Sequence, residues 1–305
     1  MTITMSTTRH LLSLMDYPSE FIGDLLDLAA SMKADRSAYR DVLRDRTMAM
    51  IFQKRSTRTR VSFEVGMSQL GGTSLFLSSG DIQLGASESV EDTARVLGRY
   101  VDVIMARVFA HEDLHGLTAG GVPVINGLSD LLHPCQALAD LLTIREHRGT
   151  VDGVTLAYLG DGNNVCHSLI NAAARTGLRL RVAAPTGYEP DAAVLAAARA
   201  DGADVSVGTD PVEAVAGADA VYTDVWASMG QEDEAEARGR LFEPYRVDEA
   251  LFNRAAPDAI FLHCLPAHRG DEVTDGVLDG PRSAVLDQAE NRMHTEKAVL
   301  LRLLT

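Results

Sequence analysis

The chain of 305 residues is long enough for two domains of about 150 residues each. Its composition, 46% hydrophobic and 23% charged, is that of a soluble globular protein and excludes disordered and fibrous classes. Asp and Glu total 43 against 28 Lys and Arg, and the net charge of -15 repels nucleic-acid phosphates and anionic membrane surfaces. We therefore expect no nucleic-acid partner and no membrane partner.

Cysteine usage predicts a cytoplasmic location. Cys135, Cys166 and Cys264 are odd in number and widely spaced, unlike a disulfide framework, which indicates a reducing compartment. No stretch approaches the roughly 18 apolar residues of a membrane-spanning helix. The first twelve residues lack the apolar run of a signal peptide.

Short apolar runs alternate with helical patterns along the whole chain, which predicts parallel sheets flanked by helices. The first series of expected strands covers 47–52, 73–77, 101–107 and 122–126. The second series covers 155–159, 180–184, 204–207, 220–223, 259–262 and 283–286. The order indicates the α/β class, with two doubly wound domains that each hold a parallel sheet and are joined by interdomain helices.

Two long helices are expected outside the strand series. Residues 134–147 begin with Pro at a favourable first helical position and should join the domains. Residues 290–304 should form a closing helix that packs back on the first domain. The predicted domains are therefore 1–148 completed by 289–305, and 149–288. The acidic stretch 231–240 is the best candidate for a mobile loop.

A basic loop follows the first expected strand. The segment from Ser56 to Thr59, Ser-Thr-Arg-Thr, begins a helix and supplies hydroxyls, backbone N–H groups and the Arg58 guanidinium where the helix dipole favours an anion. This pattern predicts a phosphate or carboxylate site. The alternative is that Ser56 merely caps the helix, and it is weakened by the local density of bases, namely Lys54, Arg55, Arg58 and Arg60. The loop is not a Walker A sequence.

Further ligand candidates lie near the interdomain helix and at a strand end. His133 and Gln136 are spaced to project to one side, where both can hydrogen-bond a carbonyl or amide, although a lone His before a helix is more often a cap. Arg107 closes an apolar strand, at the end where ligands bind in open α/β sheets. Gln83 lies in the Gly- and Ser-rich segment 78–89, which is long enough for a binding loop.

The second domain begins with a glycine-containing turn that resembles a dinucleotide fingerprint only in part. Val165 replaces the third glycine, and the second strand ends without an acid to hold a ribose, so an oxidoreductase is a weak alternative. Asn163 and Asn164 follow the strand and could hold the carboxylate or amine of a small ligand.

Two more strand ends carry polar side chains. Asp224 suits a cationic amino group and is followed by Ser228-Met229-Gly230. Cys264 begins a Pro-bounded turn; it could be a nucleophile, but no Cys-His-Asn signature surrounds it, and a buried structural cysteine is commoner. The Cys and His residues lack the spacings of metal sites, so no metal is expected.

Four motifs occur in the order found in ornithine carbamoyltransferases, and the chain resembles this branch of the aspartate/ornithine carbamoyltransferase family over essentially its whole length. The motifs are Ser56-Thr-Arg-Thr-Arg60, His133-Pro-Cys-Gln136, Asp224 with Ser228-Met-Gly230, and His263-Cys-Leu-Pro266. The resemblance implies transfer of the carbamoyl group of carbamoyl phosphate to the side-chain amine of L-ornithine, giving L-citrulline and phosphate. It also implies two α/β domains with the active site in the cleft, homotrimers or multiples of trimers, and no cofactor.

The resemblance further implies a role for each matching residue. The carbamoyl phosphate set is Ser56, Thr57, Arg58 and Thr59 on the phosphate, Arg107, His133 and Gln136 on the carbamoyl group, Gln83 from a neighbouring subunit, and Cys264, Leu265 and Arg292 closing the site. The ornithine set is Asn164, Asp224, Ser228 and Met229. The residues expected in catalysis are Arg58, Arg107, His133, Asp224 and Cys264. The segment 267–270 resembles the anabolic branch, which serves arginine biosynthesis.

The chemistry of carbamoyl transfer agrees with these residue types. An amine must attack the carbamoyl carbon and expel phosphate, so the site needs cations at the leaving group and donors for the developing oxyanion. Ornithine's side-chain amine is mostly protonated near pH 7, and we hypothesise that Asp224 and Cys264 orient it and favour its neutral form. Two alternatives stay open: a carbamoyltransferase for another amine such as putrescine, and a non-catalytic protein that binds a phosphorylated metabolite.

Overall fold

The computed structural model describes residues 9–78, 88–227 and 235–305. The chain divides into two compact units. Unit 1 comprises Met1–Asp16, Asp24–Cys135 and Met293–Thr305, and unit 2 comprises Tyr17–Gly23 and Gln136–Arg292. Three helices have residues in both units: α1 (Ser19–Ala34), α5 (Pro134–Arg148) and α12 (Val285–Leu304). The division between the units thus falls inside α5 and α12 rather than at their ends. The expected domain boundaries after residue 148 and before residue 289 stay a prediction.

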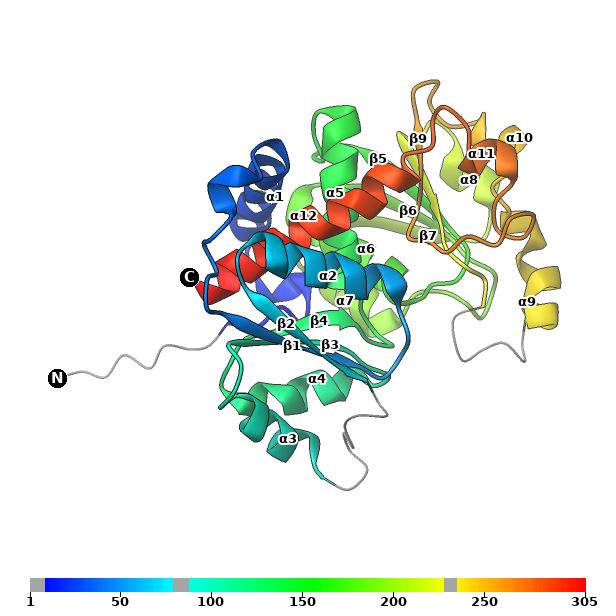
Figure 1. Cartoon of the computed structure of the whole chain (residues 1–305). Coiled ribbons are helices and arrows are strands. Elements are labelled where there is room, and N and C mark those ends of the chain that lie inside the picture. The colour runs from blue at the N-terminus through cyan, green and yellow to red at the C-terminus, as the bar shows by residue number, and fades with distance from the viewer. Residues whose placement is uncertain (1–8, 79–87, 228–234) are drawn as a thin grey trace. The chain divides into compact units, whose positions relative to one another are not determined.

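Unit 1 contains a parallel four-stranded sheet in the order β2-β1-β3-β4. In Figure 1, α2 lies on one side of this sheet, and α3 and α4 lie on the other. Because β2 adds to one edge of β1 and β3 to the other, the sheet has a topological switch point between β1 and β3. The bounds are β1 (Thr47–Phe52), α2 (Thr57–Gln69), β2 (Thr73–Ser78), α3 (Val90–Leu97), β3 (Val103–Arg107), α4 (His111–Leu117) and β4 (Val124–Leu128).

The C-terminal half of α12 packs closely on α2 within unit 1. A Cβ atom placed on Gly66 would lie 3.2 Å from Cγ of Lys297. The Lys297 side chain is fully buried, and its Nζ donates to Oε1 of Gln69 at 3.2 Å. Burial lowers the pKa of the Lys297 amine. A glycine on α2 thus permits the close approach of the closing helix.

Unit 2 contains a parallel five-stranded sheet in the order β7-β6-β5-β8-β9, with a second switch point between β5 and β8. The strands are β5 (Thr155–Leu159), β6 (Arg179–Ala183), β7 (Asp204–Gly208), β8 (Ala220–Thr223) and β9 (Ile260–His263). The helices are α6 (Asn164–Thr176), α7 (Ala192–Ala200), α8 (Pro211–Val215), α9 (Ala235–Phe242), α10 (Glu249–Phe252) and α11 (Asp275–Leu278).

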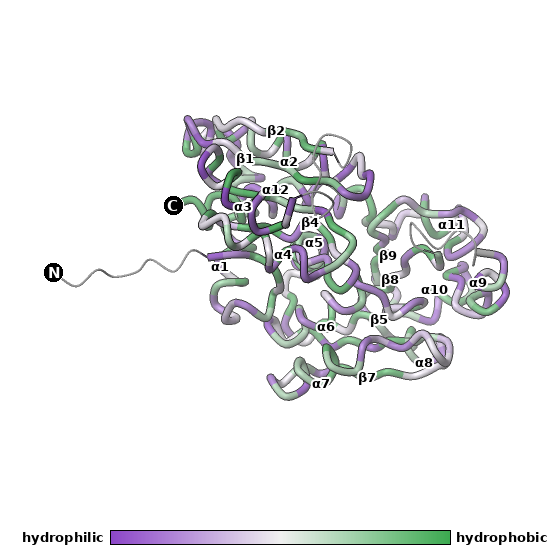
Figure 2. The backbone as a smooth tube through the Cα atoms, turned by 90° about the horizontal axis from the view of Figure 1, so that it is seen from below, coloured by the Kyte–Doolittle hydropathy of each residue, from purple (hydrophilic) through white to green (hydrophobic). Residues whose placement is uncertain are grey.

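Side chains of these strands alternate between two buried faces. Ala157, Val221 and Phe261 lie in one hydrophobic cluster with residues of α8, α10 and α11. Tyr158 and Tyr222 lie on the other face, where their ring centroids are 5.7 Å apart. In Figure 2 the backbone of β8 and β9 is mainly hydrophobic, whereas α9 carries hydrophilic stretches. Both faces of the sheet are therefore covered.

The expected strand at 283–286 is wrong. Only Ser283 forms a parallel bridge, to Phe261, and α12 begins at Val285. The N–H of Ala284 donates to the carbonyl of Phe261 at 2.9 Å, after which the chain turns into a helix whose Leu286 is 76% exposed. The closing helix consequently begins before the expected residue 290. The other nine expected strands occur, with ends that differ by at most two residues, and α5 ends one residue after the expected 147.

The expected mobile loop at 231–240 is only partly within the described structure. Residues 231–234 lie outside the described residues, and 235–240 belong to α9 rather than to a loop. Arg238 stabilises α9, because its Nη1 donates to Asp161 at 2.7 Å and to the carbonyl of Trp226 at 3.0 Å. Among the described helices, none combines the length and apolar character needed to cross a membrane.

The buried cluster makes a stability prediction. Phe261 belongs to β9, is fully buried and contacts Phe252 of α10. Replacing Phe261 by Ala leaves a cavity and should lower the free energy of unfolding by about 3–5 kcal/mol. Replacing the exposed Leu286 by Ala should change it by less than about 0.5 kcal/mol. Urea denaturation followed by circular dichroism compares the two variants, and equal effects would contradict the burial described for Phe261.

Candidate active site

The basic loop between β1 and α2 forms a polar helix N-terminus. Ser56 is the N-cap of α2, with extended backbone, and its Oγ accepts a hydrogen bond from the N–H of Thr59 at 3.3 Å. The first turn of α2 contains no acidic residue, so the positive end of the helix dipole is not neutralised locally. Thr57 is exposed, Arg58 is half-buried and Thr59 is buried. The dipole and the N–H groups of this helix start would stabilise an anion bound here.

Arg107 lies beside this loop, at the switch point of the unit 1 sheet. It pairs in register with Phe52, the last residue of β1, and is only 6% exposed. Gln53 connects the two strand ends: its N–H donates to the carbonyl of Arg107 at 2.9 Å, and its Oε1 accepts from the N–H of Phe109 at 2.7 Å. The topology thus brings together a loop and an arginine that are far apart in sequence.

Lys54 adds a second cation at the same edge. Its Nζ lies 4.7 Å from the ring centroid of Phe109. Burial lowers the pKa of the Lys54 amine, the neighbouring Arg107 lowers it further, and Asp130 raises it. From the sequence, Lys54 was named only as one of several basic residues in the loop. Its place between the end of a buried strand and the Ser56 cap was the signal that could have identified it.

His133 and Gln136 occupy the start of α5, as expected. His133, which belongs to unit 1, is 5% exposed and directly precedes the helix. The adjacent Cys135 Sγ donates to the carbonyl of Asn126 at 3.3 Å, which fixes this end of α5 against β4. Gln136, in unit 2, is 1% exposed, and its Oε1 accepts from Nη1 of Arg292 at 2.8 Å. Two motifs that lie 156 positions apart in the sequence therefore meet at Gln136.

Asn163 connects the strands on either side of the second switch point. Its Oδ1 caps α6 by accepting from the N–H groups of Val165 at 2.9 Å and Cys166 at 3.2 Å. Its Nδ2 donates to Oδ2 of Asp224 at 2.8 Å. Asn164, the predicted ornithine ligand, is the partly buried first residue of the helix. The residue pattern treated the two asparagines alike and the family resemblance singled out Asn164, whereas the structure makes Asn163 a cap that also orients Asp224.

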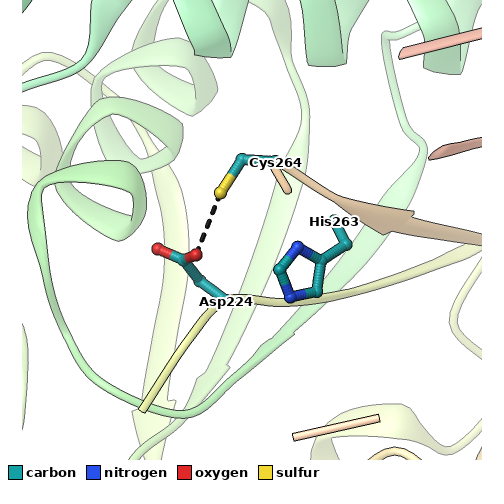
Figure 3. Close-up of side chains that lie close together, drawn as sticks. All are labelled: Asp224, His263 and Cys264. Carbon is teal, nitrogen blue, oxygen red and sulfur yellow. Dashed lines mark hydrogen bonds between the residues drawn. The ribbon is translucent and has the colours of Figure 1, made fainter. Parts of the chain in front are cut away.

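Asp224 and Cys264 meet at the ends of β8 and β9 (Figure 3). Cys264 Sγ donates to Oδ1 of Asp224 at 2.9 Å, and the N–H of Val225 donates to the same oxygen at 2.8 Å. Asp224 is 7% exposed. With Asn163, three donors surround this carboxylate, which suits it to receive a cationic amine as a further donor.

The turn after Cys264 is tightly constrained. Leu265 has φ of 58°, a left-handed conformation that is uncommon for a bulky residue and concentrates at functional sites. Its N–H donates to Nδ1 of His263 at 2.9 Å, and Nε2 of His263 lies 3.2 Å from Oε1 of Glu272. Both side chains of the His263–Glu272 pair are fully buried. His263 therefore supports the backbone that presents Cys264 and Leu265.

Asp224, His263 and Cys264 also form a candidate metal cluster. Within the described residues, they are the one group whose ligand atoms, all within 4.8 Å of one another, could hold an ion. Both ring nitrogens of His263 already make hydrogen bonds, and the Cys264 thiol donates to Asp224. A bound metal would have to break these contacts, so the arrangement favours a hydrogen-bonded site over a metal centre.

Three expected site residues cannot be placed. Gln83, Ser228 and Met229 lie outside the described residues. The other expected residues lie at a strand end or helix start of their own unit, except Arg292, which lies within α12. Unit 1 holds Ser56, Thr57, Arg58, Thr59, Arg107 and His133, and unit 2 holds Gln136, Asn164, Asp224, Cys264, Leu265 and Arg292.

Solved structures similar to this chain carry the same fold. The ornithine carbamoyltransferase from Pyrococcus furiosus matches with a TM-score of 0.92 and 54% identity, covering 96% of each chain. The one from Thermus thermophilus matches with a TM-score of 0.88 and 46% identity, covering 97% of this chain and 99% of that one.

Comparisons of sequence agree with the comparisons of structure. The chain is 55% identical to the ornithine carbamoyltransferase of Pyrococcus horikoshii, covering 97% of this chain and 96% of that one. It is 54% identical to the anabolic ornithine carbamoyltransferase of Pseudomonas aeruginosa, covering 96% of each. The family model for the carbamoyl-P binding domain matches residues 9–146, and that for the Asp/Orn binding domain matches 152–303. With both of its halves matched in this order, the chain belongs to the aspartate/ornithine carbamoyltransferase family.

Proposed function

We propose that this enzyme transfers the carbamoyl group of carbamoyl phosphate to the side-chain amine of L-ornithine, releasing L-citrulline and phosphate. The observation that carries the choice of acceptor is the buried Asp224 carboxylate with the Cys264 thiol bonded to it. A buried carboxylate attracts the ammonium groups of ornithine and repels the additional carboxylate of aspartate. The names of the relatives point to the same acceptor.

In the proposed reaction, residues of unit 1 bind the phosphate and the carbamoyl oxygen of the donor substrate. Ser56, Thr57, Arg58 and Thr59 hold the phosphate through hydroxyls, helix N–H groups and a guanidinium. Lys54 adds positive charge near Arg107, so an anion relieves the repulsion between these two cations. Arg107 and His133 donate to the carbamoyl oxygen, which becomes negatively charged as the amine adds to the carbon. On the same proposal, Gln136 accepts from the carbamoyl NH2 group.

After the ammonium proton has passed to water, the neutral acceptor amine attacks the carbamoyl carbon, and the bond from that carbon to the bridging oxygen breaks, so phosphate leaves with the electron pair. The proton released by the amine passes to the departing phosphate. A carboxylate stabilises a neighbouring ammonium, which argues against the hypothesis from the sequence that Asp224 favours the neutral amine. We therefore assign to Asp224 the binding and orientation of ornithine rather than its deprotonation. Asn164, Ser228 and Met229 complete the ornithine site in this proposal, while Cys264, Leu265 and Arg292 close the carbamoyl phosphate site.

We further propose an anabolic, cytoplasmic homotrimer in which Gln83 serves the site of a neighbouring subunit. The anabolic role is supported by relatives of that name at 54–55% identity. A cytoplasmic location is supported by the three cysteines, which form no disulfide within the described residues and two of which are buried. The trimer is supported by the motif resemblance, which implies that Gln83 acts in trans.

The acceptor is tested by product formation. Incubation with carbamoyl phosphate and ornithine should produce citrulline, and putrescine or aspartate in place of ornithine should give far less product. Chromatographic quantification of all three carbamoylated products checks this. Comparable rates with putrescine would overturn the assignment of ornithine, and phosphate-analogue binding without any carbamoylated product would favour a non-catalytic protein.

Arg58 should be essential for turnover. Replacing Arg58 by Ala removes a cation from the leaving phosphate and should reduce kcat on the order of 100- to 1,000-fold. The matched control is Arg60→Ala on the same helix, because the Arg60 guanidinium already bonds Glu64 at 3.0 Å and stacks 3.8 Å from the Phe76 ring centroid. Steady-state citrulline production compares them, and equal losses would contradict a specific role for Arg58.

Asn163 should affect both stability and ornithine binding. Asn163→Ala removes the α6 cap and a donor to Asp224, so it should destabilise the fold by about 1 kcal/mol and raise the KM for ornithine on the order of 10-fold. Asp191→Ala removes the cap of α7, where Oδ1 accepts from Ala193 at 2.9 Å and Val194 at 3.0 Å. This control should lose similar stability with an unchanged KM. A raised KM in both variants would indicate that general destabilisation is responsible.

A further inference from the structure

A buried carboxyl group that the proposed reaction does not use lies directly behind Gln136. Asp140 is one helical turn further along α5 and is fully buried. Its Oδ1 accepts from Nε2 of Gln136 at 2.8 Å and from Nε2 of Gln288 at 2.6 Å. Gln288 comes from α12. One carboxylate oxygen therefore holds two amide groups from two helices.

This contact determines which way the Gln136 amide faces. Because Nε2 of Gln136 donates to Asp140, its Oε1 must face the other way, where Nη1 of Arg292 donates to it at 2.8 Å. A carbonyl oxygen has two lone pairs, so Oε1 retains one acceptor position beside the Arg292 bond. With the amide flipped, Gln136 would present N–H groups to Arg292 and could not accept from a ligand amide.

The same carboxylate also reaches the turn that carries Cys264. Gln288, held by Asp140, accepts from the N–H of His263 at 2.9 Å through its Oε1, and its Nε2 lies 3.2 Å from the Tyr222 hydroxyl. Asp140 thus fixes the amide orientation of Gln288 as well. The chain of contacts runs from α5 through α12 to the end of β9, and all its members belong to unit 2.

We propose that Asp140 is a positioning residue that orients the Gln136 amide so that Oε1 accepts from the NH2 group of carbamoyl phosphate. The inference rests on the proposed function, because it concerns the donor substrate of that reaction. On this proposal, Asp140 contributes to recognition of the carbamoyl NH2 group through Gln136. The phosphate is bound by the Ser56–Thr59 segment.

Protonation of Asp140 provides an independent readout. Burial raises the pKa of Asp140 to about 7, opposed by the hydrogen bonds from Gln136 and Gln288 and by the Arg292 charge. The titratable or charged groups that face it among the described residues are Arg292 from α12 and Tyr222 from β8, whose pKa burial raises so that it stays neutral. A carboxylate accepts stronger hydrogen bonds than a neutral acid, so the orientation of Gln136 should weaken as the pH falls below 7.

The test measures binding of phosphonoacetamide, in which a methylene replaces the bridging oxygen of carbamoyl phosphate, with inorganic phosphate as the reference ligand. Asp140→Leu should raise the Kd for phosphonoacetamide on the order of 10- to 100-fold and leave the Kd for phosphate unchanged. Asp140→Asn keeps an acceptor oxygen and should restore most of the affinity. An unchanged Kd for phosphonoacetamide in Asp140→Leu, or an equal loss for both ligands, would overturn the proposal.

Two further measurements keep the proposal testable if Asp140→Leu does not fold. The Kd for phosphonoacetamide of Asp140→Asn, divided by that of the wild type, should be larger at pH 8 than at pH 6. The reason is that only the wild type has an ionisable side chain at position 140. A constant ratio would overturn the proposal. In a Gln136→Leu background, Asp140→Asn should have a much smaller effect on this Kd than in the wild type, and a fully additive effect would show that Asp140 does not act through Gln136. If the wild type forms no citrulline, the proposed function fails, and that result is separate from the outcome for Asp140.

Discussion

The parallel direction of every paired strand is the constraint on which the rest of this structure depends. In a parallel sheet all carboxyl ends lie along one edge, and a switch point opens that edge to a ligand. Unit 1 places Arg107 and the Ser56 helix start beside its switch point, and unit 2 places Asn163 and Asp224 beside the other. Each unit therefore presents one cluster of polar groups, cationic in unit 1 and acidic in unit 2, which matches an anionic donor and a cationic acceptor.

Buried polar groups at these edges are held by their neighbours, as a low-dielectric surrounding requires. Asp224 accepts from Asn163, Val225 and Cys264, and His263 uses both ring nitrogens between Leu265 and Glu272. Satisfied side chains of this kind are fixed in direction before any ligand binds, which reduces the reorganisation that a reaction would otherwise require. The net charge of -15 does not describe the charge at either cluster of polar groups, because a ligand interacts with the side chains beside it rather than with the average of the whole chain.

Some site residues could be found from sequence and others could not. Ser56, Arg58, Asp224 and Cys264 were identifiable because each follows an apolar strand and belongs to a short motif. Asp140 lies in the stretch of α5 from 134 to 144 in which all residues are buried, and its four-residue spacing from Gln136 was the signal available. Its contact with Gln288 joins residues 148 positions apart, which no local pattern reports.

The sequence by itself determined the α/β class, nine strands and the family, because periodic apolar runs and adjacent motif residues are local properties of the chain. It failed at 283–286, where an apolar run forms one bridge and then a helix. Only the tertiary structure decided that Asn163 orients Asp224, that His263 supports Leu265 and that Asp140 holds Gln136 and Gln288. These are hydrogen bonds between buried groups brought together by strand order, and their partners depend on packing rather than on local sequence.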